Sequence, residues 1–86
     1  MDRYTQKNGN EYILKENLTE KDLIRRLGQF EDMYESLLQE QNAISLKMED
    51  LKSEGKKDTA TYRQLFANRL KNTELLGKFK IFIDSE

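Results

Sequence analysis

The stretch LIRRLGQFEDMYESLLQEQNAISLKMEDL, residues 23–51, decides the fold of this 86-residue chain. Its apolar residues recur at alternating steps of three and four, the heptad pattern of a helix that packs against other helices. The first core position of the heptad holds Leu27, Tyr34, Gln41 and Met48, and the second holds Leu23, Phe30, Leu37, Ile44 and Leu51. Three further apolar residues, Ile24, Met33 and Leu38, widen this stripe, which suits a helical bundle.

Both ends of this helix carry sequence signals. Thr19 is a good N-cap, and Asp22 three residues later replaces the Glu or Gln of a capping box. Leu18 and Leu23 have the spacing of a hydrophobic staple across the cap. Gly55 suits the left-handed residue that follows a helix. These signals predict one helix over about residues 20–54.

A second helix is expected after a short break. Asp58 or Thr59 can cap it, and the apolar residues that follow at helical spacing are Tyr62, Leu65, Phe66 and Leu70. Gly77 is a possible stop, so the helix is predicted over about residues 59–76. Residues 78–83 alternate as a strand would, but the run is too short to distinguish strand from helix.

The beginning of the chain reads as a β-hairpin. Residues 3–14 are RYTQKNGNEYIL, in which Asn8-Gly9 is a strong signal for a type I′ turn between two strands. The predicted fold class is therefore mainly α: an antiparallel helical hairpin with a small N-terminal β-hairpin at about residues 3–14. We expect residues 1–86 to form a single domain.

The two predicted helices differ in length. At about 1.5 Å per residue, the first is roughly 52 Å long and the second roughly 27 Å. The stretch from Leu23 to Tyr34 would then extend beyond its partner and needs a cover, either the β-hairpin, the C-terminal segment or another chain. We expect a homodimer or a larger assembly. The candidate interface residues are Leu23, Leu27, Phe30, Tyr34 and Gln41, and Gln41 could set the register or meet its own copy at a two-fold axis.

Gly28 interrupts a helix in which glycine costs about 1 kcal/mol relative to alanine. The favoured interpretation is a close contact, in which Tyr4, Tyr12 or the backbone of another chain fills the space beside Gly28. The alternatives are a ligand notch and a glycine tolerated at the surface.

The composition argues against catalysis. The chain has no Cys and no His, and it matches no nucleotide, zinc or nucleophile motif. The carboxylates of Glu31, Asp32 and Glu35 could hold Mg²⁺ only with a second acidic pair from another helix. We therefore expect no enzyme, no cofactor and no metal ion. No apolar run reaches the length of a membrane span, and a cytoplasmic protein is the default expectation.

Charge is distributed unevenly along the chain. Residues 1–51 carry a net charge of −4 and residues 52–80 a net charge of +5. The simpler interpretation is that an acidic helix packs against a basic helix of the same chain. The alternative is nucleic-acid binding through Lys56, Lys57, Arg63, Arg69 and Lys71, which alternate with Tyr62 and Phe66. These aromatic residues fall on the apolar stripe, so they are expected in the core, and nucleic-acid binding is the second choice.

Three short motifs carry a family resemblance: RYT at residues 3–5, RLGQFED at 26–32 and SEGKKDTATYRQL at 53–65. In their order they resemble a group of short uncharacterised proteins that are encoded in phages and integrated mobile elements of Gram-positive bacteria. The likeness extends from Arg3 to about Leu70. It implies an accessory protein of a mobile element and carries no activity to any residue. The expected function is an interaction module with an unidentified protein partner.

Overall fold

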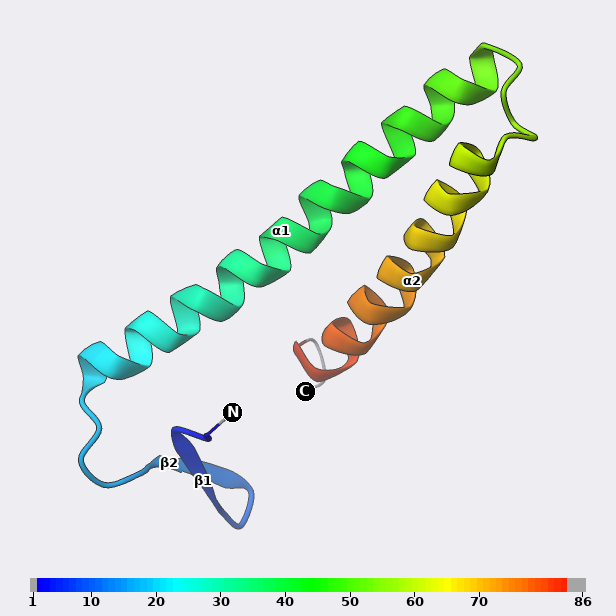
Figure 1. Cartoon of the computed structure of the whole chain (residues 1–86). Coiled ribbons are helices and arrows are strands. Elements are labelled where there is room, and N and C mark those ends of the chain that lie inside the picture. Colours follow the sequence, from blue (N-terminus) through cyan, green and yellow to red (C-terminus); the bar gives the residue numbers. More distant parts are fainter. Residues whose placement is uncertain (1, 84–86) are drawn as a thin grey trace. The chain divides into compact units, whose positions relative to one another are not determined.

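The computed structural model describes residues 2–83 and is mainly helical (Figure 1). Its elements are β1 (Thr5–Asn8), β2 (Glu11–Leu14), α1 (Glu20–Ser53) and α2 (Ala60–Ile83). The two long helices contact each other as a hairpin, and β1 and β2 form a small antiparallel sheet, so the predicted fold class is confirmed. The chain divides into two compact units, Met1–Asp32 and Met33–Glu86, which we describe separately. The single domain expected from the sequence stays a prediction.

The β-hairpin of the first unit turns one residue later than predicted. Strand pairing runs from Thr5↔Leu14 to Asn8↔Glu11, so the two-residue loop is Gly9-Asn10 and not Asn8-Gly9. Gly9 has a positive φ of 65°, whereas Asn10 does not. A positive φ at the first loop residue alone is typical of a type II′ turn, which needs glycine there. The sequence signal located the hairpin correctly but gave the wrong turn type.

A capping box starts α1, as predicted. The backbone N–H of Thr19 donates to the Asp22 carboxylate at 2.9 Å, and the N–H of Asp22 donates to the Thr19 hydroxyl at 3.2 Å. The donors on Thr19, and then the charge of Arg25, lower the pKa of Asp22 below its ordinary value. The ionised carboxylate therefore stabilises this helix end at neutral pH. That contribution is lost as the pH falls through the lowered pKa.

The connection between α1 and α2 also follows its sequence signals. Gly55 has a φ of 73°, and the N–H groups of Gly55 and Lys56 bond to the carbonyls of Lys52 and Leu51. This pair of bonds is a Schellman motif, which satisfies the last carbonyls of α1. Of the two caps considered for α2, the structure uses Thr59, whose hydroxyl accepts the N–H of Tyr62 at 3.2 Å.

The second helix is longer than predicted, because Gly77 does not end it. Helix α2 continues to Ile83, which shows that residues 78–83 are helical. The packing of Phe79 offsets the cost of the glycine: its ring meets that of Tyr34 edge-to-face, with 6.1 Å between centroids. Tyr34 is consequently part of the hairpin contact, and the predicted overhang from Leu23 to Tyr34 is wrong at this end.

The interface between α1 and α2 has very little apolar core. Ile44 and Met48 of α1, 7% and 2% exposed, are the buried hydrophobic side chains among the described residues. One turn from Ile44, Gln41 donates to the Arg69 carbonyl at 2.9 Å and to the Thr73 hydroxyl at 2.8 Å. Asn72 is also buried. Gln41 therefore fixes the register of the hairpin within one chain, which realises the register role considered for it.

The buried side of α2 differs from the predicted one. Tyr62 and Leu65 are half-buried as expected, but Phe66 and Leu70 are 50% and 53% exposed. The expectation that both aromatic residues of this segment lie in the core is therefore wrong for Phe66. Asn72 is buried at a position where a helix core usually has a hydrophobic residue. A prediction based on the spacing of apolar residues could not identify this buried polar side chain.

Gly28 is not packed against its own chain. A Cβ built at this position would have no heavy atom within 4 Å among the described residues outside its own helix turn. The predicted contact with Tyr4 or Tyr12 is wrong, since the ring of Tyr4 lies under the guanidinium of Arg26. Of the close contacts that the sequence suggested for Gly28, the one left is a contact with the backbone of another chain.

The capping box gives a first prediction. Thr19→Ala should lower the free energy of unfolding by about 1 kcal/mol, the usual cost of removing such a cap. It should also raise the pKa of Asp22 toward its ordinary value, because the Thr19 hydroxyl no longer donates to the carboxylate. Thermal melts and an NMR pH titration of Asp22 measure both effects. Thr61→Ala, an exposed change inside α2, is the control.

Gly28→Ala should stabilise the protein by about 0.5–1 kcal/mol, because alanine is the better helix former and its Cβ meets open space. For a chain of this size the melting midpoint should rise by a few degrees, about 4–8 °C per kcal/mol. A lower midpoint would contradict this expectation and would show that another chain occupies the space beside Gly28.

Candidate interaction surfaces

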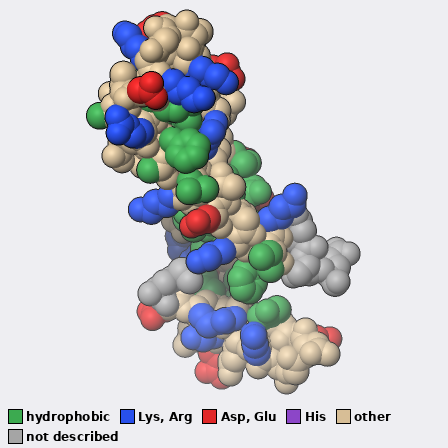
Figure 2. Space-filling model, turned by 90° about the vertical axis from the view of Figure 1, so that its right-hand side faces the viewer, with side chains coloured by type: hydrophobic (Ala, Val, Ile, Leu, Met, Phe, Trp, Pro, Cys, Tyr) green, Lys and Arg blue, Asp and Glu red, His purple; other side chains and the backbone are tan. Residues whose placement is uncertain are grey.

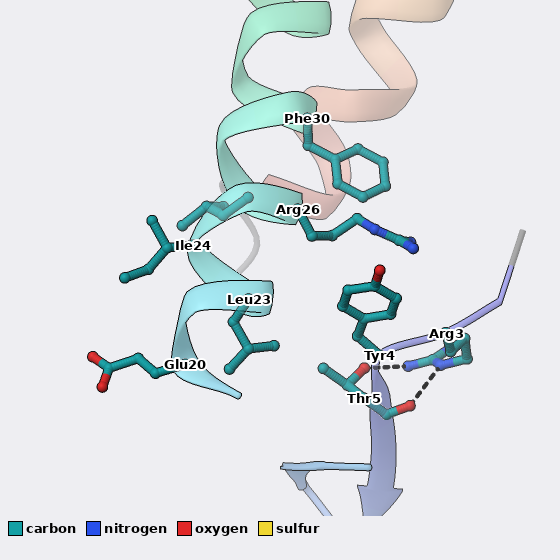
Figure 3. A pocket seen from close by; sticks show the side chains of 9 residues that line it. Arg3, Tyr4, Thr5, Glu20, Leu23, Ile24, Arg26 and Phe30 are labelled. Carbon is teal, nitrogen blue, oxygen red and sulfur yellow. Dashed lines mark hydrogen bonds between the residues drawn. The ribbon is translucent and has the colours of Figure 1, made fainter. Parts of the chain in front are cut away.

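The first unit contains an open groove. It encloses about 560 Å³ between β1 and the first turns of α1 (Figure 3). Its floor is apolar, and its rim carries polar and charged groups. The groove is lined by Arg3, Tyr4, Thr5, Glu20, Leu23, Ile24, Arg26, Leu27 and Phe30. An apolar floor with a polar rim fits a side chain or a helix of a protein partner better than a small polar substrate.

Tyr4 and Arg26 hold the two sides of the groove together. The Arg26 guanidinium lies 3.7 Å from the centre of the Tyr4 ring, close enough for a cation–π interaction (Figure 3). Arg26 also donates to the Asp2 carbonyl at 3.2 Å. The hydrogen-bonding capacity and the positive charge of Arg26 lower the pKa of the Tyr4 phenol. The interaction between Tyr4 and Arg26 thereby attaches the start of the chain to α1.

Three of the five predicted interface residues lie in this groove. Leu23, Leu27 and Phe30 line it, and Leu27 is 60% exposed. Tyr34 and Gln41 instead contact α2 of the same chain, so both are already engaged in the hairpin. The suggestion that Gln41 meets its own copy at a two-fold axis is not supported, because both of its amide N–H donors serve α2.

The sequence interpretation missed the rim of the groove. Arg3 donates to the carbonyl and the hydroxyl of Thr5, which fixes its side chain beside the groove. Ile24 was assigned only to the edge of the stripe, yet it lines the site. The sequence pattern could not predict the contact between Tyr4 and Arg26, because these residues are 22 positions apart in the chain.

The basic residues considered for nucleic-acid binding do not form one surface. Arg63, Arg69 and Lys71 lie on α2, where about 100° per residue places Arg69 about 120° around the helix from Arg63 and about 160° from Lys71. Arg63 donates to the Asp58 carbonyl at 2.8 Å, and Lys56 pairs with Glu54 at 3.2 Å. Lys57 is exposed in the connection. Arg69 is half-buried, with its guanidinium 5.8 Å from the centre of the Phe66 ring.

The acidic side chains of the described residues were the candidates for holding a metal ion. Over residues 2–83, no three Asp, Glu, His or Cys side chains converge in a way that could hold one, so Glu31, Asp32 and Glu35 do not form such a group. Neither of the helices within these residues has the length and hydropathy needed to span a bilayer.

Comparison with known proteins gives no match. No protein-family model fits the chain, and neither a curated protein nor a solved structure is detectably similar to it. The geometry of the surfaces is therefore the basis for proposing how the chain interacts.

The scattered basic residues predict that the protein does not form a discrete complex with DNA. A gel shift at physiological salt and micromolar protein should show free DNA only, because phosphate contacts need several cations on one face. A discrete complex that Arg63→Glu abolishes would contradict this prediction and would support the nucleic-acid alternative.

Proposed function

We propose that this chain is a small interaction module that works as an assembly with further copies of itself. The observation that supports this proposal is the shortage of core: Ile44 and Met48 are the buried hydrophobic side chains among residues 2–83. A small chain is marginally stable even with a full hydrophobic core. A chain with only a small buried core therefore needs further apolar contacts. An assembly supplies them.

The exposed apolar side chains show where such contacts can form. Large hydrophobic residues are exposed on both helices and on β2, and Figure 2 shows hydrophobic side chains between lysines and arginines. Clustered exposed apolar surface is typical of a site of protein association. The groove offers Leu23, Leu27 and Phe30 to a partner. A dimer or larger assembly would cover these side chains.

The biological setting is proposed from the sequence resemblance alone. The motifs RYT, RLGQFED and SEGKKDTATYRQL resemble those of short proteins from phages and integrated mobile elements. A self-assembling module suits an accessory role in such an element, in which it binds another protein. An affinity pull-down from a host that carries the element would identify that protein.

Self-assembly predicts a mass at least twice that of one chain. Sedimentation equilibrium at high micromolar concentration should give a dimer or larger species. The melting midpoint should also rise with protein concentration, because only folded chains associate and their association stabilises the folded state. A monomer mass together with a midpoint independent of concentration would contradict the proposed function.

A variant tests whether the groove takes part in assembly. Leu27→Asp puts a charge on an exposed apolar position, so it should weaken the assembly without removing a core contact. The same sedimentation experiment measures the effect. If the variant keeps the wild-type mass, the groove lies outside the interface and assembly depends on the helical hairpin of the second unit.

A further inference from the structure

An exposed row of small and apolar residues runs along α2. Phe66, Leu70, Gly77 and Ile81 follow one another at steps of four, seven and four, which places them on one side of the helix. We name these four residues the outer row. The three hydrophobic side chains are at least half exposed, and a Cβ at Gly77 would meet nothing within 4 Å. A glycine in such a row allows another helix to approach closely.

The outer row lies on the same side of the hairpin as part of α1. Residues of both helices line one shallow hollow: Ser45, Met48, Glu49 and Lys52 of α1, and Tyr62 and Arg69 of α2. The Arg69 guanidinium lies near the Phe66 ring of the outer row. Leu38, seven residues before Ser45, is on the same side of α1 and is exposed. This side, which we name the outer face, combines exposed apolar residues of both helices.

The charges of the two helices are opposite and are not paired with each other. Over its whole length α1 has a net charge of −3, and α2 has a net charge of +4. The two ion pairs among the described residues join Arg25 to Asp22 and Lys56 to Glu54, so neither connects α1 to α2. The expectation that an acidic helix packs against a basic helix of the same chain is confirmed by the hairpin contact, but neither of these two ion pairs contributes to that contact.

We propose that two copies stack on their outer faces, with α1 of each copy against α2 of the other, to form a four-helix bundle. This inference rests on the proposed self-assembly and names its contact surface. Opposite net charges favour α1 against α2, whereas α1 against α1 would bring acidic helices together. Neighbouring helices in this arrangement are antiparallel, as in most four-helix bundles, and their dipoles attract.

The register of the hairpin identifies an ion pair in this bundle. Tyr34 meets Phe79 and Gln41 meets Thr73, so facing positions have residue numbers that add to about 113. A two-fold axis parallel to the helices keeps these levels. It brings Glu49 of one copy level with Arg63 of the other, twice in the dimer. Arg63 uses one N–H on Asp58, and a guanidinium has five N–H donors, so it retains donors for a carboxylate.

The test exchanges these two charges between chains. Glu49→Arg alone and Arg63→Glu alone each put like charges at both contacts, and each should weaken dimerisation about tenfold at low salt. An equimolar mixture of the two variants restores opposite charges at both contacts. It should form a heterodimer with close to wild-type affinity. Sedimentation measures the dissociation constants, and circular dichroism confirms that each variant is helical.

The control and the contrary outcomes are specific to this arrangement. Glu40→Arg makes the same charge change nine residues earlier, on the opposite side of α1, and should leave dimerisation unchanged. If wild-type protein dimerises but Glu49→Arg behaves like Glu40→Arg, or mixing gives no recovery, the stacking is wrong while self-assembly stands. If the wild-type protein is a monomer, the proposed function fails and this inference fails with it.

Discussion

The contact between α1 and α2 is the interaction on which the described fold depends, and polar groups determine much of it. Among residues 2–83, Ile44 and Met48 are the buried hydrophobic side chains, while Gln41 donates to both Arg69 and Thr73. The Gln41 Oε1 acceptor and the Asn72 Nδ2 donor are buried without partners. Such a contact specifies the register well, because a shift would leave more polar groups unpaired, but it adds little hydrophobic stabilisation. The stability of the folded chain must therefore come largely from contacts other than the one between α1 and α2.

Helix ends were predictable because the forces that set them are local. The capping box of Thr19 and Asp22 and the left-handed Gly55 use atoms within a few residues of each other. The exception is the end of α2, which depends on the distant pair Tyr34–Phe79. Propensity at Gly77 indicated a stop, and a tertiary contact overrode it. The predicted type of the β-hairpin turn was wrong for a related reason, since the turn type is set by the pairing of the whole strands.

The candidate site was predicted only in part. The heptad identified Leu23, Leu27 and Phe30, which line the groove, because a helical stripe can be read from spacing. It could not show that Tyr34 would contact α2, since its partner Phe79 lies beyond the predicted end of that helix. Nor could spacing alone show that Gln41 would bond to α2 of its own chain and not face another chain. Nor could it find Tyr4 and Arg26, whose contact joins two elements that are separate in sequence. Spacing reveals which residues share a face but does not reveal what covers that face.

Two glycines illustrate this limit. Gly28 and Gly77 both lie inside helices, where glycine is unfavourable, and a Cβ at either position would meet no atom within 4 Å among the described residues outside its own helix turn. Within one chain, both positions would be more stable as alanine. Gly77 lies in an exposed apolar row on the basic helix α2, and no ion pair among the described residues joins α2 to the acidic helix α1. At Gly77, open space beside a costly glycine, exposed apolar neighbours and the opposite net charges of the two helices together support the proposal that this surface packs against a second copy.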